Sequence, residues 1–233
     1  SIVVTTDDGR EAAGQRLLIA CGRTVDVSDL GLASIGIDAD ATHLETDANM
    51  QVTDGLWAMG DVTGHGVYSH VALYHSAIIA AEILGERHAP AAYHAVPRGT
   101  FTDPEVGSVG KSEAQAQDAG IDVAVAVEQL PATFKGFVEA AERGLVKLIA
   151  DRSTGELVGA TTVGPHGTEM LGMLNLAVHA HLPISKLQSM IYAFPTYYGA
   201  TGAALGAWGR GLMLALDPDY DGLKAIDAAA GEE

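Results

Sequence analysis

Residues 56–66, LWAMGDVTGHG, and the apolar run at 71–84 that follows them constrain the fold more than any other part of the sequence. Their pattern predicts a short apolar strand, a turn and a helix. Gly60 lets the backbone approach a bound group closely, and Asp61 holds a carboxylate where the strand opens into a loop. Taken alone, this glycine and this aspartate are equally consistent with an ordinary strand turn.

The helix is expected to begin near Ser69 or His70 and to stop at Gly85. Its apolar residues occupy much of its circumference, which indicates burial on several sides. Free N–H groups and the positive end of the helix dipole suit an electron-rich group at its start. In a doubly wound sheet, ligands bind outside the carboxyl ends of the strands, so we expect Asp61 where a ribose or ribityl hydroxyl arrives.

Composition narrows the class of protein. A chain of 233 residues that is 48% apolar is long enough for one or two domains with a substantial core. Its net charge of −17 argues against nucleic acid and anionic membrane surfaces as partners. The single cysteine, Cys21, excludes an internal disulfide, a cysteine-rich zinc site and a two-cysteine redox centre within this sequence. With no membrane-length apolar run and no signal-peptide pattern at its start, the expected location is the cytoplasm.

The first part of the sequence predicts β structure and loop. Residues 1–6 and 16–21 predict the two strands of a hairpin, the second nearly all apolar and hence covered on both faces. Residues 24–46 predict a loop with short helical turns, and 54–55 a turn before the central strand. A polar, proline-containing connection at 86–93 predicts a domain boundary.

The second part predicts several strands and helices. Strands are expected at 97–101, 122–129, 144–151 and 157–163, turns at 103–105 and 153–156, and helices at 111–120 and 168–181. A further short helix is expected to begin at Pro183. Residues 217–233 are acidic and poor in large apolar side chains, so this end is expected to fray.

Four segments of the sequence occur in a characteristic order. They are LIACGR at 18–23, LWAMGDV at 56–62, FTDPEVGSVG at 101–110 and FPT at 194–196. In these segments the sequence resembles the flavoprotein pyridine nucleotide-disulfide oxidoreductases, which include dihydrolipoamide dehydrogenase, glutathione reductase and mercuric reductase. The resemblance extends to about residue 210, and the order of the four segments makes it more specific than any one of them.

The resemblance implies an α/β partial FAD-binding domain with the end of the nucleotide domain at residues 1–90. An α+β dimerisation domain with a mixed sheet and helices follows at 92–212, and an acidic tail at 213–233. The implied cofactor is FAD, contacted by Gly60, Asp61, His70, Val71 and Ala72, with NAD(P)H as the reductant of the full-length enzyme. A homodimer formed through residues 92–212 and a small-molecule acceptor are also implied.

Two features of complete family members are missing from the sequence. No Gly-x-Gly-x-x-Gly dinucleotide fingerprint follows a strand, and no pair of redox cysteines occurs. Cys21 is expected to be a small buried hydrophobe rather than a nucleophile. The sequence therefore resembles the carboxyl-terminal part of a longer enzyme, and by itself it is expected not to turn over.

The carboxyl-terminal motif departs from the family. Members that reduce disulfides carry His-Pro followed by Glu, a base with its orienting carboxylate, and here Phe194 and Gly199 stand in these positions. Phenylalanine cannot carry a proton, so this motif supplies no catalytic base. Tyr197 and Tyr198 are the alternative sources of a hydroxyl, although aromatic packing of these tyrosines and Tyr192 at a dimer seam is the favoured explanation.

The remaining polar candidates have structural explanations. Arg23 is as consistent with an ion pair that caps strand ends as with a functional role. His65, His70 and His75 indicate a polar turn and a helix face rather than a zinc site, so no metal is expected.

The sequence thus predicts part of an FAD-dependent NAD(P)H oxidoreductase that moves hydride from nicotinamide to flavin and then to an unidentified acceptor. Two alternatives stay open. One is a mercuric reductase-like, peroxidase-like or transhydrogenase-like member of the family. The other is a non-catalytic, stand-alone dimerisation module.

Overall fold

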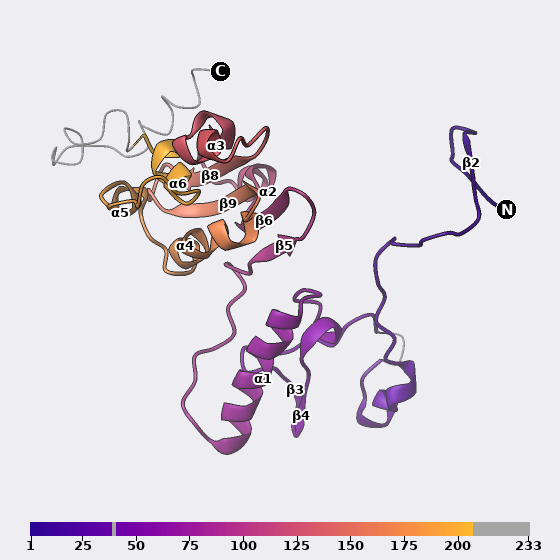
Figure 1. Cartoon of the computed structure of the whole chain (residues 1–233). Helices are drawn as coiled ribbons and strands as arrows, with labels where there is room; N and C mark the ends of the chain where they lie inside the picture. Colours follow the sequence, from indigo (N-terminus) through magenta and orange to yellow (C-terminus); the bar gives the residue numbers. More distant parts are fainter. Residues whose placement is uncertain (39–40, 207–233) are drawn as a thin grey trace. The chain divides into compact units, whose positions relative to one another are not determined.

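The structure is a computed structural model that describes residues 1–38 and 41–206. The chain divides into two compact units, Ser1–Ala91 and a second unit that begins at Ala92 (Figure 1). The acidic tail predicted at 213–233, and the fraying predicted for 217–233, lie outside the described residues. Among the helices of the described ranges, none is long and apolar enough to cross a membrane.

A short hairpin begins the first unit, where β1 (Ile2–Thr5) pairs antiparallel with β2 (Glu11–Gly14). The prediction of a hairpin strand at 16–21 is wrong. This segment forms no strand, Leu18 is 89% exposed, and Cys21, expected to be buried, is exposed as well. An apolar strand of this kind needs partners at its edges and on both faces, and the described part of the first unit provides none for it.

The rest of the first unit surrounds a small core. Two short 3-10 helices, η1 (Ser28–Leu30) and η2 (Leu32–Ile35), confirm the loop with helical turns. Strands β3 (Gln51–Thr53) and β4 (Leu56–Trp57) form an antiparallel hairpin. The buried apolar side chains of this core are Val27, Leu32, Leu44 and Ala58.

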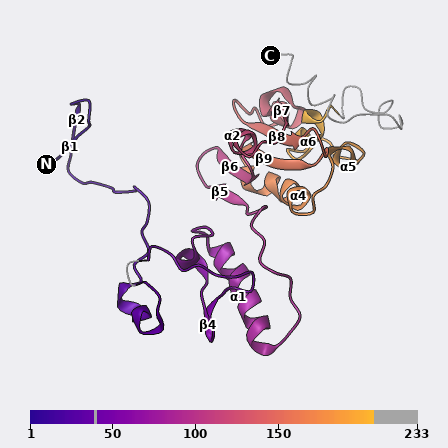
Figure 2. The same cartoon turned by 180° about the vertical axis from the view of Figure 1, so that it is seen from behind.

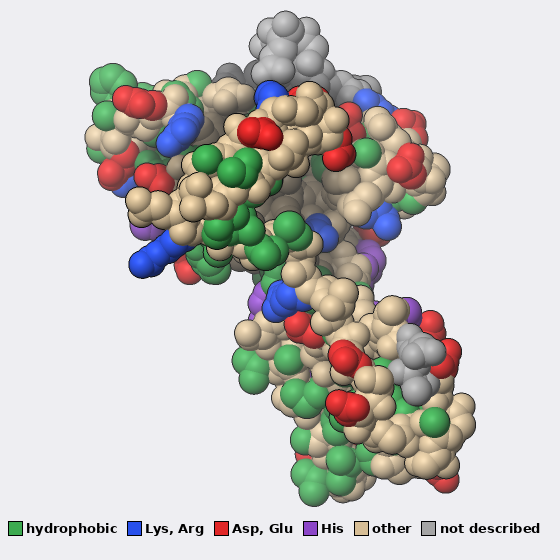
Figure 3. Space-filling view, turned by 90° about the vertical axis from the view of Figure 1, so that its right-hand side faces the viewer, with side chains coloured by type: hydrophobic (Ala, Val, Ile, Leu, Met, Phe, Trp, Pro, Cys, Tyr) green, Lys and Arg blue, Asp and Glu red, His purple; other side chains and the backbone are tan. Residues whose placement is uncertain are grey.

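The central strand is shorter than predicted. β4 stops at Trp57, and the chain enters the 3-10 helix η3 (Gly60–Thr63) because Gly60 adopts a positive φ of 73°. Helix α1 (Ser69–Leu84) confirms the predicted helix and ends at Gly85. Apolar side chains of α1 remain exposed within the first unit, among them Leu73 and Leu84, and apolar side chains reach the surface of both units in Figure 3.

The second unit is built on a five-stranded sheet of order β5-β6-β9-β8-β7 (Figure 2). Its strands are β5 (Arg98–Thr100), β6 (Glu105–Gly110), β7 (Val123–Gln129), β8 (Leu145–Asp151) and β9 (Leu157–Gly164). Every pairing is antiparallel rather than mixed, because most neighbouring strands are consecutive in the chain and joined by short connections.

Four of these strands were predicted, and β6 was not. Gly107 weakens the strand signal of β6, yet the packing requires a glycine there. A Cβ at Gly107 would lie 2.8 Å from the carbonyl oxygen of Gly167. The start of helix α4 (Gly167–His179) therefore lies directly against the backbone of β6.

Two helices cover one face of the sheet. Helix α4 packs on β6 and β9, and α6 (Gly199–Ala204) packs on β7 and β8, so that a single apolar core lies beneath both. The predicted helix at 168–181 is confirmed in α4. The unit also contains α2 (Glu113–Asp118), η4 (Leu130–Ala132), α3 (Phe134–Val138) and α5 (Ile184–Gln188). The predicted α+β class is confirmed.

Candidate functional site

The predicted flavin-contacting residues lie where η3 meets α1 in the first unit. A Cβ at Gly60 would lie 3.3 Å from the Cβ of Ala72, so the two residues approach closely and the position favours glycine. The Gly60 backbone N–H donates a hydrogen bond to Nδ1 of His75 at 3.0 Å. The turn at Gly60 is thus held in contact with Ala72 and His75 of helix α1.

Asp61 presents a partly accessible carboxylate. Its side chain is 39% exposed, and Oδ2 lies 3.3 Å from Nη1 of Arg23. Nη2 of Arg23 donates to the carbonyl oxygen of Val67 at 2.9 Å. Arg23 therefore forms an ion pair, but with the carboxylate that was predicted to contact a ligand.

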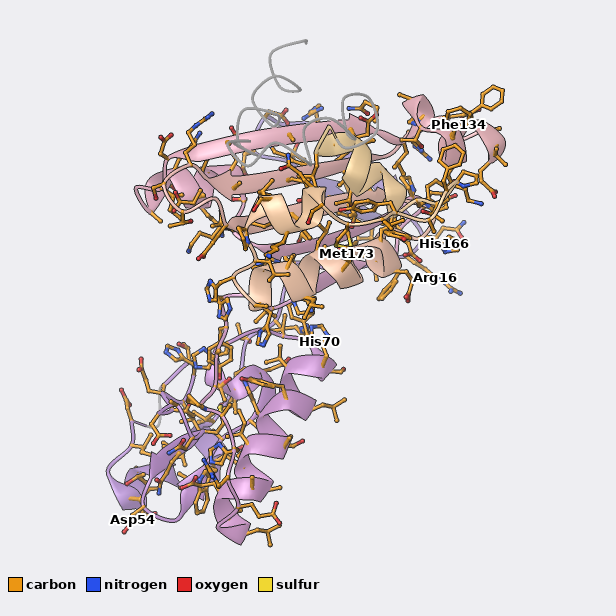
Figure 4. The ribbon with its side chains drawn as sticks, turned by 90° about the vertical axis from the view of Figure 1, so that its left-hand side faces the viewer. Arg16, Asp54, His70, Phe134, His166 and Met173 are labelled. Carbon is orange, nitrogen blue, oxygen red and sulfur yellow. The ribbon has the colours of Figure 1, made fainter. Side chains whose placement is uncertain are left out.

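The start of α1 carries the other predicted contacts. His70 is exposed in the first turn (Figure 4) and stacks on Tyr68, with ring centroids 5.1 Å apart. Val71 is buried. No side chain caps the first turn, whose N-terminal flanking residue is Tyr68. The backbone N–H groups of Val71 and Ala72 donate to the Tyr68 carbonyl oxygen, at 3.0 and 3.2 Å.

His75 is a residue whose importance the sequence did not reveal. It is fully buried, and burial, followed by the nearby His65, lowers the pKa of its imidazole. Nδ1 must be unprotonated to accept from the Gly60 N–H. The neutral ring therefore holds the turn of η3 against α1.

The second unit contains a cavity of about 290 Å³ at one end of its sheet. Its lining residues come from β7, the η4 and α3 segment, the Phe194-Pro195 segment and α6. They are Glu128, Ala132, Thr133, Phe134, Lys135, Ala193, Phe194, Pro195, Thr196, Gly199, Ala200 and Ala203. Phe134 projects from the end of this unit in Figure 4.

The motif positions Phe194 and Gly199 both line this cavity. Phe194 follows an extended loop, is 56% exposed and packs edge-on against Phe134, with ring centroids 4.8 Å apart. The Phe194-Pro195 peptide bond is cis. In place of a histidine base and its carboxylate, the cavity therefore has an aromatic pair and a glycine.

The neighbouring tyrosines do not belong to the lining described for the cavity. Tyr197 is buried in the core, where burial raises its pKa, and Nζ of Lys135 lies 5.7 Å from its ring centroid. The Tyr198 hydroxyl accepts from the Ala193 N–H at 2.7 Å. The Tyr192 hydroxyl donates to the Leu187 carbonyl at 2.9 Å, and burial raises the pKa of Tyr192 to about 12.

Glu128 is a lining residue that sequence reasoning missed. It is half-buried, and burial raises the pKa of its carboxyl group. The signal was present, because strand alternation places Glu128 on the face of Ala124 and Ala126, both fully buried.

The histidines and acidic residues of the described ranges form no group of three arranged to hold a metal ion. His94 stacks between His179 and His181, with centroid distances of 5.6 and 4.6 Å. Nε2 of His94 forms a hydrogen bond with the carbonyl oxygen of His179 at 3.1 Å.

Comparison with known proteins gives a consistent family. Residues 96–204 match the family described as pyridine nucleotide-disulphide oxidoreductase, dimerisation domain. A dihydrolipoyl dehydrogenase of Halobacterium salinarum is 34% identical over 208 residues, which cover 86% of this chain and 43% of that protein. One from Chlorobaculum tepidum is 33% identical over 181 residues, covering 77% of this chain and 39% of that protein. The chain thus spans less than half the length of these curated relatives.

Solved structures agree with the fold. LpdA (Rv3303c) from Mycobacterium tuberculosis matches with a TM-score of 0.78 at 26% identity, over 87% of this chain and 44% of that one. The HOCl-induced flavoprotein disulfide reductase RclA from Escherichia coli matches with a TM-score of 0.75 at 28% identity, over 87% of this chain and 47% of that one.

Proposed function

Because this chain belongs to the pyridine nucleotide-disulphide oxidoreductases through its dimerisation domain, we propose that it is part of an FAD-dependent NAD(P)H oxidoreductase. The observation that supports this most is the match over residues 96–204, joined to a first unit whose Gly60 and Asp61 suit a flavin. The proposed overall reaction moves hydride from NADH or NADPH through the flavin to a small-molecule acceptor.

The residues at the η3–α1 junction are proposed to contact the flavin. Gly60 has no side chain to stand between its backbone and a bound group, and Asp61 offers a carboxylate to the ribityl hydroxyls. His70 and Val71 lie in the first turn of α1, where the positive end of the helix dipole suits the electron-rich pyrimidine end of the ring. Bound flavin supplies the hydride chemistry, and these residues orient it.

The acceptor is proposed to be something other than a dithiol such as dihydrolipoamide. Disulfide exchange needs a proton carrier, and Phe194 and Gly199 line the cavity where the family's base and carboxylate are expected. The alternatives within the family, namely mercuric reductase-like, peroxidase-like and transhydrogenase-like activities, differ in the redox cysteines that accompany the flavin.

The second unit is proposed to form a homodimer. Large apolar side chains of the second unit are exposed, among them Phe101 and Phe137 at 81% each and Ile191 at 96%. Monomers rarely leave such a surface open to water. The same surface is also consistent with the alternative function, a dimerisation module without catalytic activity.

A flavin-retention experiment on the full-length protein tests the proposal. Asp61→Ala is expected to weaken FAD binding about ten- to hundredfold, because it removes a charged hydrogen-bond acceptor. Asp54→Ala, an exposed aspartate in the β3–β4 turn, is the matched control and is expected to retain FAD. Equal retention in Asp61→Ala and wild type would refute the assignment, and wild type without bound flavin or NAD(P)H oxidation would favour the non-catalytic module.

A further inference from the structure

The covered face of the second unit's sheet carries a carboxyl group at its end. Glu128 on β7 is directly opposite Val146 on β8, and Val146 is opposite Thr162 on β9. Val146 and Thr162 are fully buried. Glu128 therefore belongs to the core-facing row, and its half-buried side chain lines the cavity.

The other polar side chains of the cavity are already engaged. Thr133 Oγ1 donates to the Leu130 carbonyl at 2.7 Å and accepts from the Gly136 N–H at 3.1 Å. Thr196 Oγ1 makes the same pair of bonds, to the Ala193 carbonyl at 2.6 Å and from the Gly199 N–H at 3.1 Å.

Lys135 is engaged as well, since its Nζ lies 2.6 Å from Oε1 of Glu139. Glu128 differs from these residues. Within the described residues it makes no hydrogen bond or ion pair, and burial is the cause that raises its pKa. Among the polar side chains described as lining the cavity, Glu128 is thus the one whose carboxyl group is left to form hydrogen bonds with a ligand.

Few charges surround this carboxyl group. Helix α6 contributes no titratable side chain, and β8 presents Val146 opposite it. Helix α2, which also packs on β7, carries Asp118 and Glu113, and Glu113 pairs with Lys147 of β8 at 2.6 Å. The η4–α3 segment contributes the Lys135–Glu139 pair, and the loop before α6 contributes Tyr197 and Tyr198, whose rings pack elsewhere. Protonation of Glu128 is therefore governed by its apolar surroundings and by what enters the cavity.

We propose that Glu128 is the proton-donating residue of this cavity, which binds a flat, weakly polar carbonyl compound of the quinone class. This proposal rests on the proposed function for its source of hydride. The edge-on pair of Phe134 and Phe194, together with Pro195 and the alanines, suits an aromatic ring. The protonated carboxyl group suits a carbonyl oxygen at the ring's edge.

The proton balance of the reaction is complete with this residue. Reduction of a quinone to a hydroquinone takes up one hydride and one proton. The O–H bond of the Glu128 carboxyl group breaks and an O–H bond forms at the quinone oxygen, and the carboxylate then regains a proton from water. Glu128 would thus replace the base that Phe194 cannot be.

Equilibrium binding to the full-length oxidised protein, without NAD(P)H, tests the proposal. The probe is 2,3-dimethyl-1,4-naphthoquinone. Its methyl groups block the two ring positions at which the exposed Cys21 thiol could add to the quinone. Between about pH 5 and about pH 8, wild-type affinity is expected to fall about 2- to 12-fold, because the carboxylate no longer donates a hydrogen bond. Glu128→Gln keeps a donor and is expected to bind equally at both pH values.

Three further variants complete the test. Glu128→Ala is expected to bind weakly at every pH, and Ala203→Leu, which narrows the cavity, to weaken binding without removing its pH dependence. Glu142→Gln, an exposed carboxylate, is the matched control and is expected to behave as wild type. Circular dichroism at each pH shows that the variants remain folded.

Binding by the wild type that is independent of pH, or that matches Glu128→Ala, would overturn the proposal. Tetramethylammonium binding that strengthens with rising pH would also overturn the proposal, because it would show that the Glu128 carboxylate binds cations. A protein that binds FAD and oxidises NADH but shows no Glu128-dependent probe binding would refute this inference alone. Glu128-dependent probe binding in a protein without flavin would refute the proposed function instead.

Discussion

At the scale of single residues, a buried polar group is stabilising or costly according to whether it has a partner. Glu128 and the tyrosines near Phe194 illustrate both cases within one unit. Glu128 and the hydroxyl of Tyr197 have no partner within the described residues, whereas the hydroxyl of Tyr192 does. The sizes of these effects can be measured by substitutions that change one group and keep its shape.

Glu128→Gln is expected to raise the free energy of unfolding at neutral pH by up to about 1 kcal/mol. Because burial raises the pKa of Glu128 in the folded protein, the native carboxylate is disfavoured at neutral pH relative to the unfolded chain. The gain over wild type should shrink as the pH falls toward the unfolded pKa. Urea titrations at several pH values measure it, and a gain that grows in acid would contradict the expectation.

Tyr192→Phe is expected to lower the free energy of unfolding by about 1 kcal/mol, because it leaves the Leu187 carbonyl without its donor. Tyr197→Phe is the matched comparison and is expected to be neutral or slightly stabilising, because its buried hydroxyl lacks a partner within the described residues. Thermal unfolding of the two variants side by side decides this. Equal losses would show that the Tyr197 hydroxyl is bonded in solution.

At the scale of elements, the junction of η3 and α1 depends on one imidazole. His75→Ala would leave the Gly60 N–H without its acceptor, a loss expected to cost about 1–3 kcal/mol. His70→Ala, an exposed histidine of the same helix, is the control and is expected to cost little. Hydrogen exchange at the Gly60 amide reports the bond directly, and unchanged protection in His75→Ala would show that another group holds the turn.

The same junction is expected to weaken in acid. Burial lowers the pKa of His75 in the folded state, so below its ordinary value of about 6.5 the unfolded chain binds more protons. The stability of the first unit should therefore be complete above about pH 7 and fall as the pH drops toward the lowered pKa. His75→Gln should lose most of this pH dependence, and a wild-type profile that is flat in this range would contradict the expectation.

Sequence patterns predicted elements well where the local signal and the final environment agree. Helix α1 and strands β7, β8 and β9 were found, because alternation and helical periodicity match their burial. The segment at 16–21 failed, because its apolar character calls for neighbours that the described first unit lacks. The predicted strand at β4 extends too far, to Gly60, because the chain turns there through a positive φ angle that the amino-acid composition does not reveal.

The candidate sites show the same limit. Phe194 and Gly199 were identified from a motif, and both line the cavity. Glu128 was not predicted as a site residue, because the last residues of a strand are ordinarily exposed to solvent. The helix α6 that covers this strand is also far from Glu128 in the sequence. His75 was assigned to a polar helix face, because its partner is a backbone N–H, which every residue possesses.

At the scale of the whole molecule, the second unit is expected to dimerise. Ile191→Asp, at the most exposed large apolar side chain of the described second unit, should raise the dimer dissociation constant more than about tenfold. Ile35→Asp, an exposed isoleucine of the first unit, is the matched control and should leave dimerisation unchanged. Sedimentation velocity at tens of micromolar measures both, and a wild type that stays monomeric there would count against the dimer.

The exposed run of Leu17, Leu18 and Ile19 affects how residues 1–233 behave when they are produced by themselves. An apolar backbone segment with unpaired N–H and C=O groups is a template for β pairing with another copy of the same chain. Such pairing is intermolecular, so it grows with concentration while folding within one chain does not. Aggregation that begins at these residues is therefore expected to speed up as the purified protein is concentrated and to slow down on dilution.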